Sequence, residues 1–159
     1  MNHDFDALLR WYETLTPASL DRLGDFYAAD AAFKDPFNDV TGLPAIRKVF
    51  SHMFAATENP RFFIVDKMRD GNQAFASWRF EFGLNGKKYE IAGVTHFLLN
   101  DEGKIASHRD YWDVAEELWQ KLPLLGPLVG WLRSRFSAAR SNVISEDGHE
   151  KPKSRSDRR

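Results

Sequence analysis

The chain has 159 residues, no cysteine and a formal net charge of −1. This length suits one domain with its own hydrophobic core, and the lack of cysteine excludes disulfides, thiol nucleophiles and thiolate metal ligands. The near-neutral charge gives no basis for nucleic-acid binding. We find neither a signal-peptide pattern nor a run of the roughly 18 apolar residues that a membrane span needs, so we expect a cytoplasmic protein.

The first third of the chain predicts three helices, with a short strand between the second and the third. Apolar residues recur at helical spacing, and Thr16-Pro17 is an N-cap signal with proline at the first helical position. The helices are expected at residues 4–15, from Thr16 to Tyr27 and from Pro44 to Phe54, with the strand at Ala31–Lys34.

The period then changes from that of helices to that of strands. Four strands are expected, at Phe62–Arg69, Gln73–Phe82, Lys88–Leu99 and Ile105–Tyr111. Hairpin signals such as Asn85-Gly86 separate them, which predicts an antiparallel sheet with one face packed on the helices. Residues 114–136 are apolar at helical spacing, so we expect a C-terminal amphipathic helical extension. Its prolines should break it into two pieces. Residues 137–159 are polar, and we expect them to be disordered.

Three stretches carry a family resemblance: Phe26–Pro36, which ends in Asp-Pro; Phe80–Phe82 with Val94–Phe97; and Gly103–Ile105 with Arg109–Asp113. In order and spacing they resemble the nuclear-transport-factor-2-like superfamily, which includes ketosteroid isomerases, limonene-epoxide hydrolases and SnoaL-like polyketide cyclases. The resemblance implies a cone-shaped α+β fold, with three N-terminal helices packed on a curved antiparallel sheet. It divides the chain into a SnoaL-like domain at 1–113, the extension at 114–136 and the tail at 137–159.

The resemblance to the isomerase implies only part of its catalytic set. The aspartate that precedes proline and acts as the isomerase's base corresponds to Asp35. The two oxyanion-hole positions fall on Trp11 and Thr95, which are weaker hydrogen-bond donors than the tyrosine and protonated aspartate of the isomerase. The neighbouring Tyr12 could replace Trp11 only if the first helix were rotated.

The resemblance to the epoxide hydrolase is also partial. The aspartate of its final strand corresponds to Asp110. Its other strand residues, an arginine and an aspartate, fall near Ala76 and Trp78, which cannot perform their chemistry. The chain therefore keeps one acid from each family and completes neither catalytic set.

Strand alternation predicts which side chains share the inner face of the sheet. The expected site has apolar walls and few polar groups, as small-molecule pockets do. Its predicted substrate-binding residues are Trp11, Tyr12, Trp78, Phe80, Phe82, Thr95 and Trp112. We predict Asp110, assisted by His108, as the general acid/base, and Asp35 as a second acid/base or substrate-positioning group.

Simpler roles for these residues stay open. Asp35 could only form a turn, Asp110 could pair with Arg109, Arg79 or His108, and His108 could be an ordinary buried histidine. The His108-x-Asp110 spacing offers two metal ligands without a third, so we expect no metal. No nucleotide-binding glycine loop or nucleophile elbow is present, so we expect no cofactor.

Two functions therefore compete. The first is cofactor-free acid/base catalysis of the isomerase, cyclase or hydrolase type on a hydrophobic small molecule. The second is a non-catalytic ligand-binding or accessory module. The resemblance also implies a homodimer through the outer sheet face, which bears Arg79, Glu81, His96, Arg109 and Tyr111. The extension at 114–136 is expected to be a lid, a dimer contact or a membrane-surface helix.

Overall fold

The computed structural model describes residues 5–114 of the chain. The elements in chain order are helix α1 (Phe5–Glu13), 3-10 helix η1 (Ala18–Arg22), helix α2 (Leu23–Phe26), strands β1 (Tyr27–Lys34) and β2 (Asp39–Thr41), helix α3 (Leu43–Ala56), and strands β3 (Glu58–Asp70), β4 (Gln73–Leu84), β5 (Lys87–Leu99) and β6 (Ile105–Tyr111). The predicted extension and tail lie outside the described residues. Within residues 5–114, no helix is long and apolar enough to cross a membrane.

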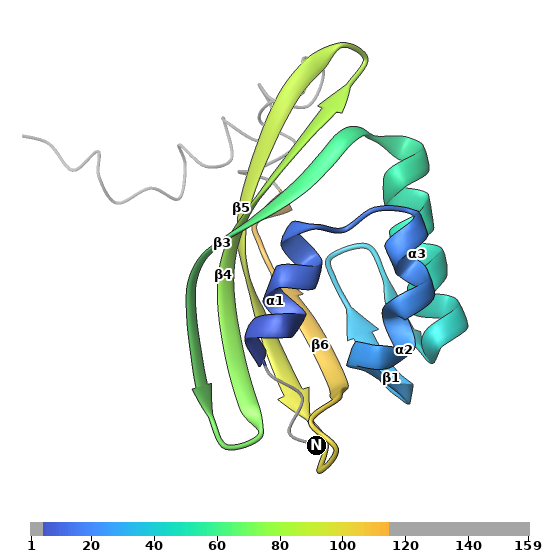
Figure 1. Ribbon diagram of the computed structural model, residues 1–159. Coiled ribbons are helices and arrows are strands. Elements are labelled where there is room, and N and C mark those ends of the chain that lie inside the picture. Colours follow the sequence, from blue (N-terminus) through green and yellow to red (C-terminus); the bar gives the residue numbers. More distant parts are fainter. Residues whose placement is uncertain (1–4, 115–159) are drawn as a thin grey trace, which may run out of the picture.

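The six strands form one curved sheet in the order β2-β1-β6-β5-β4-β3, and α1 and α3 pack on its concave side (Figure 1). The predicted α+β fold, with helices on a curved sheet, is confirmed. The sheet is mixed rather than wholly antiparallel, because β1 runs parallel to β6 while the other neighbours are antiparallel. The strands β3 to β6 form the predicted meander, and β1 joins it at the edge of β6.

The second predicted helix is shorter than the sequence suggests. It ends at Phe26, and Tyr27 begins β1 instead of closing the helix. Pairing of Tyr27 with Ile105 of β6 explains the difference, because this long-range contact outweighs the local helical spacing. The side chain of Tyr27 is consequently buried in the interior of the protein.

Turn chemistry fixes the register of the long central strands. Asn85 and Gly86 have φ values of 53° and 74°, as the two central residues of a tight hairpin turn require. The pairing of β4 with β5 then runs without a break from Gln73 opposite Leu98 to Leu84 opposite Lys87. This register decides which side chains of the two strands share the inner face.

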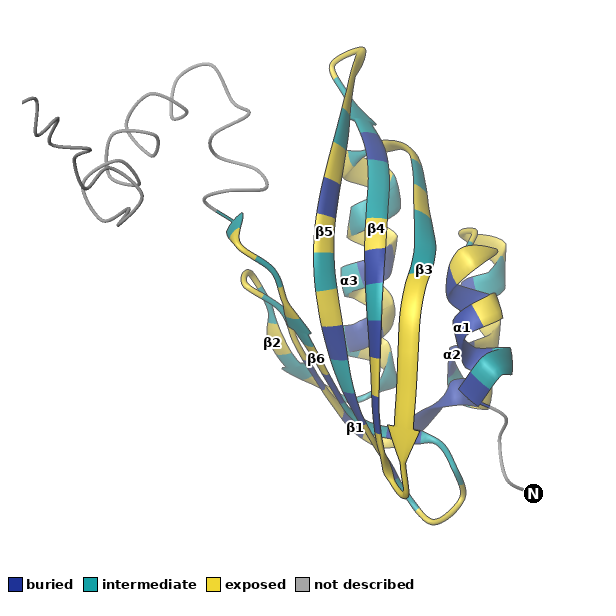
Figure 2. Cartoon of the chain, turned by 90° about the vertical axis from the view of Figure 1, so that its left-hand side faces the viewer, coloured by how far each residue is buried: buried dark blue, intermediate teal, exposed yellow. Residues whose placement is uncertain are grey.

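The core lies between the helices and the concave face of the sheet. Alternate residues of β4 and β5 are buried, with α3 behind them (Figure 2). A second, smaller cluster extends toward the β4–β5 turn, where Phe62, Phe80 and Phe82 stack in sequence at ring-centre distances of 4.5 Å and 5.2 Å. The polar residues of the inner face lie between these two apolar regions.

Candidate functional site

Three neighbouring strands bring the predicted polar residues together. Thr95 of β5 lies directly opposite Asp110 of β6, and His108 is two residues before Asp110 on the same face. Trp78 of β4 approaches from the next strand and bonds to Thr95. Thr95 is 2% exposed and His108 3% exposed, so both depend on hydrogen-bond partners inside the protein.

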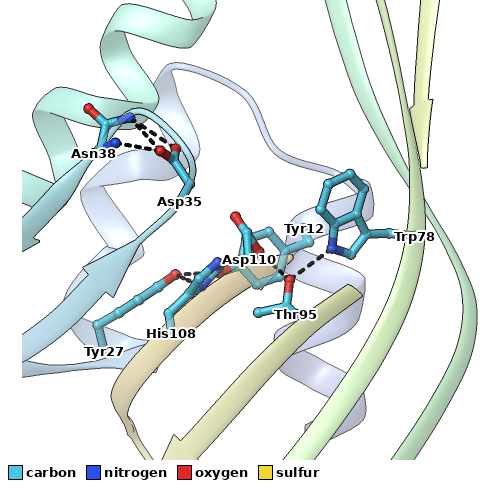
Figure 3. Close-up of polar contacts among 8 residues, drawn as sticks. All are labelled: Tyr12, Tyr27, Asp35, Asn38, Trp78, Thr95, His108 and Asp110. Atoms are coloured by element: carbon cyan, nitrogen blue, oxygen red, sulfur yellow. Dashed lines mark hydrogen bonds and ion pairs between the residues drawn. The ribbon is translucent and has the colours of Figure 1, made fainter. Parts of the chain in front are cut away.

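The indole of Trp78 sets the direction of the hydrogen bonds. Its Nε1–H can only donate, and it donates to Thr95 Oγ1 over 2.8 Å. The Thr95 hydroxyl in turn donates to Asp110 Oδ1 over 2.5 Å (Figure 3). His108 Nε2 lies 2.9 Å from the same oxygen, so with Asp110 as a carboxylate the imidazole carries its proton on Nε2 and donates it to Oδ1.

Two tyrosines hold the other side of the imidazole. His108 Nδ1 lies 2.7 Å from the Tyr27 hydroxyl and 3.0 Å from the Tyr12 hydroxyl, and the two hydroxyls also bond to each other. With the proton on Nε2, Nδ1 must accept one of these phenol hydrogens. Burial raises the pKa of both phenols well above the ordinary value of 10.0, and the charge of Asp110 adds to the effect. Both tyrosines are therefore neutral donors.

The chain of hydrogen bonds converges on one oxygen of Asp110. Oδ1 receives bonds from Thr95 and His108, whereas no donor among residues 5–114 bonds to Oδ2. The carboxylate is 16% exposed, in contrast to its buried neighbours. Asp110 is thus held firmly through one oxygen and keeps the other available.

A narrow cavity borders this carboxylate. Its volume is about 30 Å³, enough for about two water molecules at roughly 10–15 Å³ each. It is lined by Leu9, Tyr12, Phe50, Phe62, Ile64, Ala76, Trp78, Thr95, Phe97, His108 and Asp110. Asp110 also lines an outer groove of about 510 Å³, so its carboxylate stands between the interior and the surface.

Five predicted site residues meet at this cavity: Tyr12, Trp78, Thr95, His108 and Asp110. Trp11 does not, because its ring packs on Phe26 at 5.0 Å and its N–H donates to the Ser19 carbonyl. One residue along a helix turns the side chain by about 100°. The orientation of α1 therefore points Tyr12 at the sheet, and Tyr12 takes the position that we predicted for Trp11.

Three more predicted lining residues lie outside the cavity. Phe80 and Phe82 share the inner face with Trp78 but belong to the cluster near the β4–β5 turn, where Phe82 stacks on Tyr89. Trp112 follows β6 and lines the outer groove, with its ring 5.6 Å from that of Phe37.

The carboxylate of Asp35 stabilises the turn that follows it. Its Oδ1 accepts the backbone N–H of Phe37 over 2.7 Å and that of Asn38 over 2.6 Å, and the Asn38 amide bonds to both carboxylate oxygens. This is an Asx turn, one of the simpler alternatives that the sequence left open. Asp35 also lines the outer groove beside Asp110, but no hydrogen bond joins it to the Asp110 chain (Figure 3).

Of the three partners considered for Asp110, His108 is the one it contacts, through the hydrogen bond from Nε2. Arg109 lies over the ring of Tyr111 at 5.0 Å, and Arg79 bonds to Glu90 over 3.0 Å. Within the described part of the chain, no group of three histidine, aspartate or glutamate side chains is arranged to hold a metal ion.

Tyr27 is the member of this network that the sequence analysis missed. Because Phe26 and Tyr27 were both assigned to the second predicted helix, Tyr27 was not considered as a residue of the site. Tyr27 is buried like Ala31 and Phe33, but Ala29 between them is exposed and the register of β1 shifts between Tyr27 and Ala32, so strand alternation gave no clear signal for it.

The curved mixed sheet, the helices on its concave side and the polar residues at its inner face define a protein of the nuclear-transport-factor-2-like class. A family model described as a SnoaL-like domain matches residues 8–108. The chain therefore belongs to the SnoaL-like family. A comparison with curated proteins found no match.

Solved structures share this fold at low sequence identity. A protein from Catenulispora acidiphila with a ketosteroid isomerase-like fold, in complex with trimethylamine, is 21% identical, with 68% of this chain and 83% of that chain covered and a TM-score of 0.59. A protein from Jannaschia sp. assigned as a SnoaL-like polyketide cyclase is 14% identical, with coverages of 70% and 86% and a TM-score of 0.62. A protein from Agrobacterium tumefaciens assigned as an isomerase of the SnoaL-like family is 20% identical, with coverages of 68% and 92% and a TM-score of 0.58.

Proposed function

We propose that the site at Asp110 binds a small, largely apolar molecule and that Asp110, assisted by His108, transfers a proton to or from it. The observation that carries this proposal is the asymmetry of the carboxylate. Oδ1 is held by Thr95 and His108, whereas Oδ2 receives no bond from residues 5–114, and the side chain lines both the cavity and the outer groove. A general base needs this combination of fixed position and available lone pair.

The residues behind Asp110 suit such a role. His108 bonds to the carboxylate through Nε2 and to Tyr27 through Nδ1, so a proton change at Asp110 can be balanced along a continuous chain of hydrogen bonds. The phenols stay neutral because burial raises their pKa, and they therefore fix the orientation of the imidazole without adding charge. The reaction needs no cofactor.

The relatives support chemistry of this class. The Jannaschia protein is assigned as a cyclase and the Agrobacterium protein as an isomerase, and proton transfer is the ordinary means of both reactions. We therefore place the activity among cofactor-independent isomerases, cyclases or hydrolases.

A second function is a non-catalytic binding or accessory module. The small cavity favours it, because about 30 Å³ is far below the roughly 300–1,000 Å³ of a typical ligand pocket. A catalyst for a large substrate would have to open this region, for example between Tyr12 and Phe62, which line both the cavity and a second outer groove.

The test is proton exchange in heavy water, which needs no knowledge of the natural product. The full chain is incubated with a panel of apolar ketones, epoxides and lipids, and proton NMR follows both conversion and deuterium uptake. We expect turnover by the wild type, its loss in Asp110→Asn, and nearly unchanged ligand binding by that variant. Asp66→Asn, at an exposed carboxylate on the outer face, is the control and should behave as wild type. Turnover by Asp110→Asn at the rate of the wild type would reject the role of Asp110. Ligand binding by the wild type without turnover would instead support the second function.

We also propose that the protein forms a homodimer through the outer face of the sheet. Met68, Phe75, Val94, Leu98 and Tyr111 are exposed large apolar side chains on this face. Charged residues of both signs, Arg79, Glu81 and Glu90, adjoin them, so two copies related by a twofold axis can place opposite charges together.

A further inference from the structure

We infer that Trp78 is a positioning residue, whose indole N–H acts through the Thr95 hydroxyl to fix the carboxylate of Asp110. This inference rests on the proposed function, because it concerns the group that is proposed to transfer the proton. It gives Trp78 and Thr95 a different role from the substrate contact that the sequence predicted for them.

An aspartate carboxylate does not fix its own orientation. The torsion about Cβ–Cγ joins a tetrahedral and a planar carbon, so its preferences are broad and neighbouring donors decide it. At Asp110 two donors from different strands meet on Oδ1, the Thr95 hydroxyl of β5 over 2.5 Å and His108 Nε2 of β6 over 2.9 Å. One bond alone would leave an axis about which the carboxylate can turn, whereas two bonds from different directions hold it. A fixed carboxylate therefore depends on Thr95 as well as on His108.

The hydrogen of the Thr95 hydroxyl has no fixed direction of its own. It is a single hydrogen that rotates with the hydroxyl and can face any acceptor in reach. The indole of Trp78 restricts this rotation, because Nε1–H can only donate and occupies one side of Oγ1 over 2.8 Å (Figure 3). The hydroxyl hydrogen must then point away from the indole, and the acceptor that it meets there is Asp110 Oδ1.

The indole is itself held in place by its neighbours. Trp78 lies opposite Gly93 in the pairing of β4 with β5, and its ring occupies the space that a side chain at residue 93 would fill. The ring of Phe62 meets it edge to face at 5.8 Å. Trp78 and Thr95 are 7% and 2% exposed, so little water competes for the bond between them. The position of the indole thus fixes the hydroxyl, and the hydroxyl fixes the carboxylate.

A double-mutant cycle on the full chain tests this inference without a substrate. Trp78→Phe keeps a ring and removes the N–H, and Thr95→Val keeps the shape and removes the hydroxyl. The readout is the carboxyl-carbon NMR signal of Asp110, and we expect each single variant to move it. In the Thr95→Val chain, however, Trp78→Phe should move the signal much less, because the link between indole and carboxylate is already gone. Equal displacements with and without the Thr95 hydroxyl would overturn the inference, since the indole would then act by packing alone.

Two further variants make the cycle specific. Trp11→Phe is the matched control, because it makes the same chemical change at an indole that donates to the Ser19 carbonyl, and it should leave the Asp110 signal in place. Thr95→Ser keeps a hydroxyl and should keep the response of the signal to Trp78→Phe. A serine variant that behaves like Thr95→Val would contradict the role of the hydroxyl. If Trp78→Phe does not fold, Gly93→Ala takes its place in the cycle, because it displaces the same indole.

Turnover in the exchange assay adds a second readout. Loss of a positioning residue lowers kcat and leaves KM nearly unchanged, whereas loss of a substrate contact raises KM. For a compound of the panel that the wild type converts, we expect kcat to fall about 10- to 100-fold in Thr95→Val and less in Trp78→Phe, with KM within about twofold of the wild type. A raised KM at unchanged kcat would return both residues to substrate binding and overturn the inference.

The inference and the proposed function fail separately. Coupling of Trp78 to the Asp110 signal through Thr95, without turnover by the wild type, leaves the fixing of the carboxylate standing and removes the catalysis. Turnover that Asp110→Asn abolishes but that Trp78→Phe and Thr95→Val leave unchanged does the reverse.

Discussion

The indole of Trp78 packs closely against Gly93, its directly opposite neighbour in β5. A Cβ atom at residue 93 would come within 2.5 Å of Trp78 Cη2 and 2.6 Å of Cζ2, distances that side chains do not tolerate. Because the same indole donates the first hydrogen bond of the chain that ends at Asp110, the absence of a side chain at Gly93 positions the site.

Gly93→Ala should therefore displace Trp78 and weaken its bond to Thr95. We expect the free energy of unfolding to fall by about 1–3 kcal/mol, the usual cost of overpacking, and the Trp78 indole N–H signal to shift in NMR spectra. Urea unfolding measures the first effect. Gly24→Ala is the matched control, because its new Cβ would lie at an ordinary 3.6 Å from Leu43 Cδ1. Equal stabilities of the two variants would contradict the close packing.

The two buried phenols predict a loss of stability at alkaline pH. Folding raises the pKa of Tyr12 and Tyr27 above the value of 10.0 that a free tyrosine has. Above about pH 10 the unfolded chain releases these protons and the folded chain keeps them, so the folded state binds more protons and its stability falls as the pH rises. The stabilising contribution is complete below pH 10 and is lost toward the raised pKa.

Denaturant titrations between pH 8 and pH 11 measure this effect. Tyr12→Phe should reduce the fall in stability above pH 10, because one of the two titrating groups is gone, even though the variant is less stable at neutral pH. If the wild type and Tyr12→Phe lose stability in parallel over this range, Tyr12 is not the buried neutral phenol that the structure places beside His108.

Two substitutions distinguish a structural role of Asp35 from a catalytic role. Asp35→Ala removes the acceptor of the Phe37 and Asn38 backbone N–H groups, and we expect a loss of about 1 kcal/mol in unfolding free energy. Asp35→Asn keeps an acceptor and should preserve stability. Loss of turnover in Asp35→Asn would identify the predicted second acid/base, whereas normal turnover in that variant would leave Asp35 as a turn residue.

The proposed homodimer predicts a clear response to charge on the outer face. Leu98→Glu introduces a carboxylate among exposed apolar side chains, and we expect light scattering to show the mass of one chain where the wild type shows two. Asp101→Asn, at an exposed position of the turn between β5 and β6, serves as the control. A wild type with the mass of a single chain would remove the proposal directly.

Most of the fold was predictable because it depends on local pattern. The strand Ile105–Tyr111 has the predicted bounds, and Asn85-Gly86 marks the hairpin that it predicts. The sharing of one face by His108 and Asp110 follows from strand alternation alone. The parallel neighbour of β6 was not predictable, because β1 reaches it only through the tertiary fold.

The order of the longer elements, the family resemblance and the acid and imidazole of the site could be read from the residues alone, whereas the short strand β2 was not predicted. Three further points became visible only in the folded chain: Tyr12 rather than Trp11 faces the sheet, Tyr27 joins it from β1, and Asp35 is bound into its own turn. The reason is the same in each case. Packing between residues far apart in the chain decides how a helix is rotated, where a helix ends and a strand begins, and which donors reach a carboxylate. Such long-range packing cannot be inferred from local residue spacing.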